Sequence, residues 1–308
     1  MVTLLGRFNW QKEGEQALVK LTAIPQPLKG ILAGLHCLSL RLKSESGAEY
    51  AFYNCEIPLW TGLLRNWRGS YSCSIVAPAS ERTISRHRVT ESVMVTETAE
   101  LYSAVTAPHI AGVINNEGAL AWLYNILSKE KEAERVLYED PDQKHGFLLV
   151  IDTKWRSHPD PKNVPREQWL HHPAVGDLYC LAMCHQKGIS SIRDLRGCHL
   201  PMLRNIYTKG LQTIEHVYGV PASKIRVFFH YHPQFYHLHI HFSRLNNPHG
   251  VLVEHARLLL DVVQNLESDD LYYQKRTIQY RIRSTDPLLM KMKEYTSRKE
   301  VAENGGGK

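Results

Sequence analysis

The sequence lacks any long apolar run. None of its segments approaches the roughly 20 consecutive apolar residues that a membrane-spanning helix requires. The apolar run within residues 1–7 is also too short for a secretory signal peptide. These absences argue against a membrane-spanning or secreted protein, and we expect a soluble intracellular protein with no membrane partner.

Cysteines are few, and their spacing does not indicate a metal site. The chain contains six, and no two of them form the paired motif of a zinc knuckle. We expect free thiols in a reducing compartment. The cysteines are Cys37, Cys55, Cys73, Cys180, Cys184 and Cys198.

Charge of either sign is spread along the chain without a concentrated patch. The 37 basic and 31 acidic side chains give a formal net charge of +6. A small phosphorylated ligand suits this distribution better than a long nucleic acid does, because a long polyanion is usually met by a continuous basic surface. With 308 residues and 43% apolar content, the chain is large enough for a buried core and for two domains.

Short alternating or apolar runs occupy the first hundred residues, and longer periodic segments follow. The runs at 17–22, 38–42, 72–76 and 93–96 predict an antiparallel β-rich domain. Pro108 and the residues 111–118 argue against continuous structure in the link that follows. Beyond it we predict helices at 119–138, 175–188, 199–218 and 253–266, strands at 147–152, 225–230, 235–243 and 277–283, and a solvated surface loop rather than a metal site at 156–176.

Three histidines alternate with apolar residues in the segment YHLHIHF at 236–242. Side chains of a β-strand point alternately to opposite faces, so His237, His239 and His241 would share one face at intervals of roughly 6.6 Å. We call these three residues the triad. As a strand, the segment would present a row of imidazoles, which act as nucleophiles and hydrogen-bond donors toward an anion.

Three interpretations of the triad compete. Chance alternation would bury three imidazoles on one face, which is costly without partners. A zinc site is possible for two histidines on one strand, but no companion motif supplies the remaining ligand and its outer contacts. Phosphate chemistry is favoured, because a neutral imidazole is nucleophilic near pH 7 and neighbouring imidazoles can stabilise the charge of a transferring phosphoryl group.

The triad and several other segments resemble the scavenger mRNA decapping enzymes of the histidine-triad superfamily. The likeness covers nearly all of the chain after about residue 108 and is thin before it. It rests on AWLYNIL at 121–127, GFLLVIDTKW at 146–155 and HYHP at 230–233, with further support at 177–179, 200–205 and 286–289.

The resemblance implies an α+β protein. A β-rich N-terminal lid and dimerisation domain would span residues 1–105, a hinge 106–118, and a catalytic domain with an antiparallel sheet 119–308. It further implies a homodimer with exchanged N-terminal segments, located in the cytoplasm and the nucleus. The substrate would be the residual 7-methylguanosine cap on a dinucleotide or a short RNA, and the products 7-methyl-GMP and a diphosphate.

The resemblance also assigns residues to the cap. The methylated base is positively charged, so the Trp122 indole would attract it by stacking and cation–π interaction worth roughly 0.5 to 2 kcal/mol. Glu132 would accept hydrogen bonds from the guanine edge, and Asp152 and Lys154 would hold the ribose and first phosphates. Each residue taken alone has a simpler interpretation: Trp122 as a core residue, Glu132 as one of several solvent-exposed charges, and Asp152 as the end of a strand.

In the implied mechanism, His239 attacks the phosphorus next to 7-methylguanosine, and water then hydrolyses the phosphohistidine. His237 and His241 would bind nonbridging and leaving oxygens, and His230 would add a contact from the other arm of a hairpin. Because the leaving phosphate is already a stable anion, histidine donors can replace a divalent metal. No metal and no cofactor is implied.

The sequence departs from the family pattern at some positions. His255 stands where the resemblance leads us to expect an arginine, with Arg257 two residues later, and Thr153 stands in place of leucine. In the N-terminal domain, Asn54 and Arg86 are candidates for a base contact and a phosphate contact.

Two other functions compete with decapping. A hydrolase of other dinucleoside polyphosphates would show no preference for the methylated base, and Trp122 with Glu132 argues against it. A cap-binding regulator without catalysis would not need the intact triad.

Overall fold

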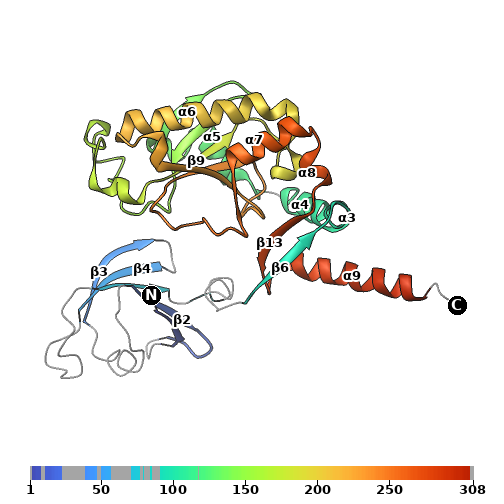
Figure 1. Ribbon diagram of the computed structural model, residues 1–308. Coiled ribbons are helices and arrows are strands. Elements are labelled where there is room, and N and C mark those ends of the chain that lie inside the picture. The colour runs from blue at the N-terminus through green and yellow to red at the C-terminus, as the bar shows by residue number, and fades with distance from the viewer. Residues whose placement is uncertain are drawn as a thin grey trace. The chain divides into compact units, whose positions relative to one another are not determined.

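The computed structural model describes residues 2–7, 11–22, 39–46, 50–56, 71–76, 79, 84, 91–116 and 118–305. The chain divides into two compact units, Met1–Val89 and Thr90–Lys308 (Figure 1). Both contain antiparallel sheets, and the described helices belong almost entirely to the C-terminal unit. The predicted α+β class is therefore confirmed at the level of secondary structure.

The N-terminal unit contains a five-stranded antiparallel sheet with the order β1-β2-β5-β4-β3. Three of its strands confirm runs that the sequence predicted at 17–22, 38–42 and 72–76. Leu18, Val76 and Ile84 form a small buried cluster in this unit. The strands are β1 (Val2–Gly6), β2 (Ala17–Thr22), β3 (Ser39–Ser46), β4 (Tyr50–Glu56) and β5 (Tyr71–Val76).

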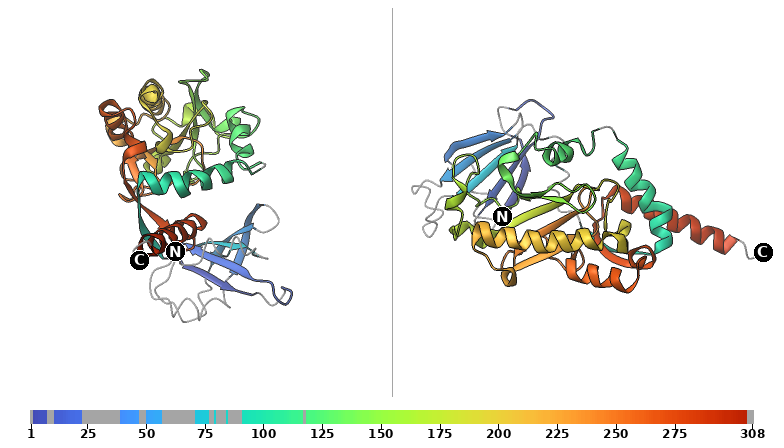
Figure 2. Two further views of the ribbon diagram at one scale, coloured as in Figure 1. Left: turned by 90° about the vertical axis from the view of Figure 1, so that its right-hand side faces the viewer. Right: turned by 90° about the horizontal axis from the view of Figure 1, so that it is seen from above.

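The C-terminal unit is built on a six-stranded antiparallel sheet with the order β12-β10-β11-β9-β8-β7. Helix α6 (Leu200–Tyr218) lies along one face of this sheet with α7 (Leu259–Ser268), as the views in Figure 2 show. Both helices confirm predicted helices, although α7 begins later than 253. The strands are β7 (Val136–Asp140), β8 (Phe147–Ile151), β9 (Tyr179–Cys184), β10 (Ile225–His230), β11 (His239–Arg244) and β12 (Ala256–Leu258).

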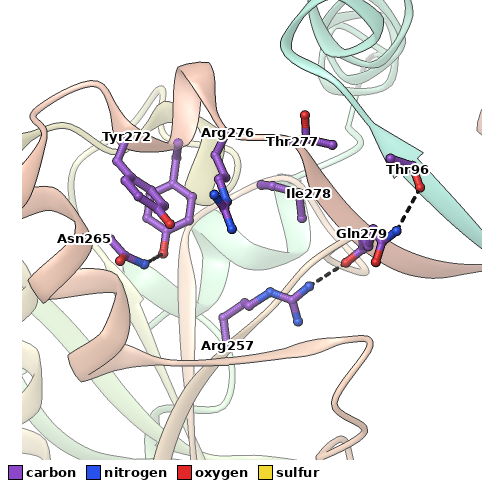
Figure 3. Close-up of a pocket in the computed structure, with 9 residues that line it drawn as sticks. Thr96, Arg257, Asn265, Tyr272, Arg276, Thr277, Ile278 and Gln279 are labelled. Carbon is purple, nitrogen blue, oxygen red and sulfur yellow. Dashed lines mark hydrogen bonds between the residues drawn. The ribbon is translucent and has the colours of Figure 1, made fainter.

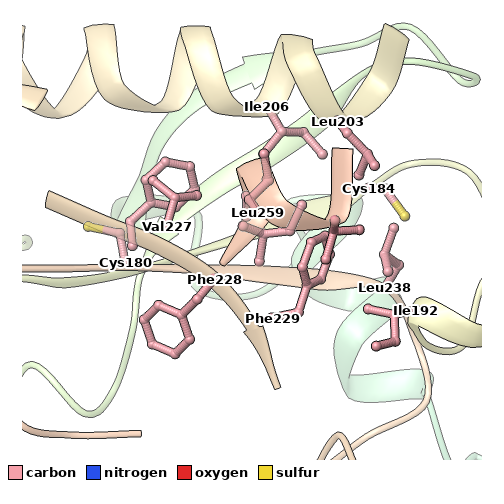
Figure 4. Packing of buried hydrophobic residues seen from close by; sticks show 14 of the residues in the cluster. Cys180, Cys184, Ile192, Leu203, Ile206, Val227, Phe228, Phe229, Leu238 and Leu259 are labelled. Atoms are coloured by element: carbon pink, nitrogen blue, oxygen red, sulfur yellow. The ribbon is translucent and has the colours of Figure 1, made fainter. Parts of the chain in front are cut away.

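The two faces of this sheet pack against different helices. Leu238, Ile240 and Phe242 alternate with the triad and lie in the large core beneath α6 and α7, part of which is shown in Figure 4. On the opposite face, Leu181 and Met183 of β9 pack with α5 (Ala121–Leu127). Because directly opposed residues share a face, the pairs His241–Leu181 and His239–Met183 place the triad on the α5 face.

The prediction of a helix at 175–188 is wrong, because the sequence LYCLAMC at 178–184 contains strand β9. Every residue of β9 is buried, since the strand lies between β11 and β8 with both faces covered. A strand buried on both faces is apolar throughout, and periodicity cannot distinguish such a run from a buried helix. Its two cysteines, Cys180 and Cys184, are free and buried.

The predicted helix at 119–138 is shorter than expected. Helix α5 ends at Leu127, a short 3-10 turn follows at η4 (Ala133–Arg135), and β7 begins at Val136. Lys129 and Glu132 both have positive φ values, and a helix cannot continue through residues in that conformation.

Residues 106–118, predicted to lack continuous structure, are largely helical. A π-turn, η3 (Tyr102–Thr106), joins α3 (Ala99–Leu101) directly to α4 (Ala107–Ile114). Pro108 is the second residue of α4. Because η3 precedes α4 without a break, Pro108 lies inside a continuous helical run and lacks the N–H that would bond to the preceding turn. The wider π-turn before it provides room for the proline ring.

The segment 156–176 packs onto the body of the unit instead of forming only a solvated loop. It contains the 3-10 turns η5 (Arg166–Gln168) and η6 (Pro173–Asp177). Trp169 is buried and stacks on Tyr218 of α6 at 6.1 Å, and His158 Nε2 lies 2.9 Å from the Tyr218 hydroxyl. The expectation of a simple surface loop failed because the segment carries its own apolar anchors.

A two-stranded ribbon forms the other part of the C-terminal unit. Strands β6 (Ser92–Glu97) and β13 (Ile278–Arg283) pair antiparallel and lie side by side in Figure 1. Residues 92–97 fall within the predicted N-terminal domain, so the compact units divide earlier along the chain than residue 105. The remaining elements are η7 (Ile192–Asp194), η8 (Gly197–His199), η9 (Ala222–Lys224), α8 (Tyr272–Lys275) and α9 (Pro287–Gly305). None of the helices within the described ranges is long and apolar enough to cross a membrane.

An ion pair between Glu97 and Arg193 is completely buried where the ribbon meets the main sheet. Arg193 Nη2 donates to Glu97 Oε1 at 2.8 Å, and neither side chain is exposed to solvent. The hydroxyl of Tyr231 also donates to Glu97. Because two buried charges are stable only when their remaining hydrogen-bonding groups are satisfied, we expect this cluster to fix the ribbon against the sheet.

Replacing Glu97 by alanine should destabilise the C-terminal unit by about 3 to 5 kcal/mol, because Arg193 would be left as an unpaired buried charge. Urea unfolding of the full chain measures this. Glu100→Ala is the matched control, since Glu100 lies three residues away and pairs with Lys299 in solvent. It should leave the unfolding midpoint almost unchanged, and similar losses in both variants would contradict the importance of burial.

Candidate active site

His239 is held with one ring nitrogen fixed and the other available. It begins β11, and its Nδ1 lies 2.7 Å from the backbone carbonyl oxygen of His237. A carbonyl can only accept a hydrogen bond, so we assign the proton to Nδ1, which leaves a lone pair on Nε2. No described protein group hydrogen-bonds to Nε2. His239 therefore has the tautomer that a nucleophile requires.

His241 presents an unsatisfied buried nitrogen next to His239. The two rings lie 5.1 Å apart between centroids, and His241 Nδ1 lies 3.2 Å from the hydroxyl of Tyr179. Its Nε2 is buried without a partner among the described residues. If Tyr179 donates to Nδ1, as we assign it, the proton of the neutral ring is on Nε2. Buried polar groups are rarely left unsatisfied, so this N–H points to a ligand that the protein itself does not provide.

A stack of imidazoles extends from the triad toward the edge of the sheet. His230, the last residue of β10, lies 4.1 Å from His241 between ring centroids and 4.2 Å from His255. His230 Nε2 donates to the carbonyl of Gly250 at 2.8 Å. A Cβ at Gly250 would lie 2.7 Å from that nitrogen, so this close approach requires glycine. The predicted grouping of His230 and His255 with the triad is present in the structure.

The His237 ring is bound to the protein backbone and is not free to contact a ligand. It lies just before β11, and its Nε2 donates to the carbonyl of Cys184 at 2.8 Å. A neutral imidazole has one N–H, so the ring has none left for a phosphate oxygen while this bond exists. The geometry gives His237 a role in holding the start of β11, and its own carbonyl orients His239.

Burial keeps these imidazoles neutral. Desolvation lowers the pKa of His239 to about 4 and the pKa of His230 to about 3, and it lowers the pKa of His241 well below its ordinary value. The ammonium of Lys154 lowers all three pKa values further. Lys154 Nζ lies over the Tyr179 ring, 5.2 Å from its centroid, which places this cation beside the triad.

An aromatic pair connects α5 to His239. Phe235 stacks on His239 with 3.9 Å between ring centroids, and Trp122 meets Phe235 edge-on at 5.1 Å. Trp122 is 44% exposed. The simple interpretation of Trp122 as a core residue is therefore wrong, and its indole is accessible near His239.

Residues 121–254 match the family described as "Scavenger mRNA decapping enzyme C-term binding". The chain is 34% identical to human m7GpppX diphosphatase over 286 residues, which cover 92% of this chain and 77% of the human protein. The chain belongs to the scavenger mRNA decapping enzyme family.

Other relatives in this family show the same relationship. The m7GpppX diphosphatase of Bos taurus is 39% identical over 222 residues, which are 72% of this chain and 60% of the cattle protein. That of Caenorhabditis elegans is 35% identical over 246 residues, 80% of this chain and 71% of the nematode protein. This family member thus aligns with about three fifths of its cattle relative.

Two predicted cap-binding residues, Glu132 and Asp152, make their hydrogen bonds with residues outside the triad. Glu132 is exposed in the turn after α5, where its carboxylate pairs with Arg135 at 3.0 Å. Asp152 follows β8 and accepts from the backbone N–H of Lys154 at 2.7 Å, which shapes the turn that presents Lys154. The side chain of Asn54 and the whole of Arg86 lie outside the described residues.

Sequence reasoning missed Tyr179, Phe235 and His232. Tyr179 falls in the segment that the sequence wrongly predicts as a helix. Phe235 precedes the triad by two residues and could have been found from the aromatic run before it. His232 is stacked on Tyr280 at 5.7 Å, its Nε2 has no partner in the described part of the chain, and burial lowers its pKa to about 3. Across the described ranges, no group of three or more His, Cys, Asp or Glu side chains is arranged to hold a metal ion.

The low pKa of His239 predicts how stability depends on pH. The unfolded chain binds the proton near pH 6.5, whereas the folded chain binds it near pH 4. The contribution of neutral His239 is thus fully present above pH 6.5 and is lost as the pH falls toward 4. Between these values, the wild-type free energy of unfolding should fall more steeply than that of His239→Asn, by at most about 1.4 kcal/mol per pH unit.

Urea titrations at several pH values measure this difference. His216→Asn is the control, because His216 is exposed on α6. Parallel pH profiles for wild type and His239→Asn would show that His239 titrates normally in the folded protein.

Proposed function

We propose that this protein hydrolyses 7-methylguanosine cap remnants, m7GpppX, to 7-methyl-GMP and a diphosphate. One observation carries the proposal. His239 and His241 are neighbours, each has an Nε2 without a hydrogen-bond partner among the described residues, and the exposed Trp122 lies near them. Family membership supports it, because the curated relatives carry the name m7GpppX diphosphatase. Long capped RNA is not part of the proposed substrate class.

In the first step, the lone pair of His239 Nε2 forms a bond to the phosphorus next to 7-methylguanosine. The bond from that phosphorus to the bridging oxygen breaks, and the electron pair leaves with the nucleoside or oligonucleotide diphosphate. The N–H of His241 and the ammonium of Lys154 stabilise the charge on the oxygens. The His237 carbonyl accepts from Nδ1–H and supports the positive charge that the phosphorylated imidazole gains.

In the second step, water attacks the phosphohistidine. A phosphorus–oxygen bond forms as the phosphorus–nitrogen bond breaks, so His239 recovers its lone pair and 7-methyl-GMP is released with one proton passing to solvent. Two displacements in line return the nucleotide without a metal. The neutral state of His239 near pH 7, caused by its burial, keeps the nucleophile available at each turnover.

Recognition of the base would depend on charge. The exposed Trp122 indole offers a face to the 7-methylguanine cation. Glu132 lies in the turn that follows the same helix, and it would have to exchange its contact with Arg135 for the guanine edge. The Arg135 contact favours a second candidate, a dinucleoside polyphosphate hydrolase without base selectivity. Turnover of methylated and unmethylated cap dinucleotide in the presence of EDTA separates the two.

The resemblance extends the proposal to the whole chain. The N-terminal domain would act as a lid, the protein would be a homodimer with exchanged N-terminal segments, and it would occur in cytoplasm and nucleus. Family membership supports this extension, because the chain aligns with 77% of the human relative. Light scattering of the full chain after gel filtration tests the dimer directly.

His239→Asn should abolish cap hydrolysis while leaving binding of m7GpppG within about tenfold of wild type, because it removes the nucleophile and keeps the strand. Rapid quench with radiolabelled cap measures turnover, and fluorescence titration measures binding. Residual turnover above about a hundredth of wild type would exclude His239 as the nucleophile.

Trp122→Ala should weaken binding of methylated cap much more than binding of unmethylated cap, by about 1 to 2 kcal/mol, because only the methylated base is a cation. Trp122→Phe keeps an aromatic face and serves as the matched control. Equal losses for both ligands in Trp122→Ala would mean a general defect and would favour the dinucleoside polyphosphate hydrolase.

A further inference from the structure

A second cavity lies in the C-terminal unit, away from the triad. It has a volume of about 560 Å³ and opens between α7, α8, β12 and the β6–β13 ribbon (Figure 3). Polar side chains make up most of its lining, and these are Thr96, Arg257, Asn265, Tyr272, Tyr273, Arg276, Thr277 and Gln279. Cavities of this size hold ligands of the size of a mononucleotide.

The cavity is on the opposite face of the main sheet from the triad. Arg257 of β12 pairs directly with Phe229 of β10, and opposed residues share a face. Phe229 lies between Phe228 and His230, which both contact His241, and neighbouring residues of a strand point to opposite faces. A ligand in this cavity would therefore not touch the triad.

Two arginines face this cavity without a carboxylate. Figure 3 shows Arg276 reaching from the end of α8 toward Arg257 on β12. Among the described residues, the Arg257 guanidinium donates to backbone carbonyls alone, those of Val253, Ala256 and Gln279, at 2.6 to 2.9 Å. The Arg276 guanidinium lies 5.8 Å from the centroid of the Tyr272 ring and forms no ion pair with the described part of the chain. The described lining includes no Asp or Glu.

This lining is unusual in its charge balance. Burial lowers the pKa of Arg257 because its charge is poorly solvated. The neighbouring cation Lys275, by contrast, has a carboxylate partner in Asp269 at 2.9 Å. The arrangement lacks an anion, and planar guanidinium groups match phosphate oxygens especially well.

We propose that this cavity is a binding site for a phosphorylated ligand of nucleotide size. Arg257 and Arg276 would bind the phosphate oxygens, and the Tyr272 ring would contact an aromatic base. The described lining offers no histidine, serine or cysteine, and the proposal concerns binding alone. It is independent of the proposed hydrolysis, and the same phosphate chemistry could be supplied by a free nucleotide or by inorganic pyrophosphate.

Calorimetric titration of the full chain with GDP and, separately, with pyrophosphate tests the site. Arg276→Gln should weaken the binding of both by about tenfold or remove one binding event, because a charged hydrogen-bond donor is lost. Lys275→Gln removes the same charge from the adjacent residue, which does not line the cavity, and should bind like wild type. Within the described ranges the Arg276 side chain has no hydrogen-bond partner, so the fold should survive its replacement, and thermal melting checks this.

Binding to the triad would persist in Arg276→Gln and in Lys275→Gln alike, so only the difference between them reports the cavity. Loss of GDP binding with unchanged pyrophosphate binding would overturn the role of the arginines. Identical isotherms for Arg276→Gln and wild type, or equal weakening in Lys275→Gln, would overturn the site altogether.

Discussion

The buried pair of Glu97 and Arg193 is the interaction on which both parts of the C-terminal unit depend. Arg193 uses its donors on Glu97, on the hydroxyl of Tyr231 and on the carbonyls of Tyr273 and Arg276. Removing these charges from water is expensive, and the cost is offset only because the guanidinium is saturated with acceptors. One residue thus fixes the ribbon, the turn after α8 and the segment that follows β10.

This cluster joins the proposed catalytic site to the second cavity. Tyr231 stands directly after His230, and its backbone N–H donates to the carbonyl of His255 at 2.8 Å. Tyr273 and Arg276 line the second cavity. Both sites are therefore attached to Arg193 through short hydrogen bonds.

The sequence predicted the parts of this fold that depend on local patterns. The alternation in residues 236–242 predicted a strand, and β11 confirms it from His239 onward, whereas residues 235–238 precede the strand. The likeness around residues 121–127 led to Trp122. The sequence pattern did not reveal β9, because a central strand and a buried helix are equally apolar. Nor could it reveal the pairing of Glu97 with Arg193, since nothing in a charged residue's neighbours indicates a partner so distant in the chain.

The structure also answers a question that the sequence left open. The resemblance predicts an arginine near the triad where this chain has His255, and Arg257 was the alternative. Arg257 faces the opposite side of the sheet, with its guanidinium bound to carbonyls, whereas His255 stacks on His230.

His255 cannot replace the charge of an arginine, because burial lowers its pKa and keeps it neutral. Among the residues that surround the triad in the described part of the chain, Lys154 is the cation that acts on His230, His239 and His241 together. Neutral imidazoles supply oriented hydrogen bonds and a lone pair, but they do not neutralise the negative charge of a phosphate. In the proposed reaction Lys154 must therefore supply the positive charge that this chain lacks at position 255.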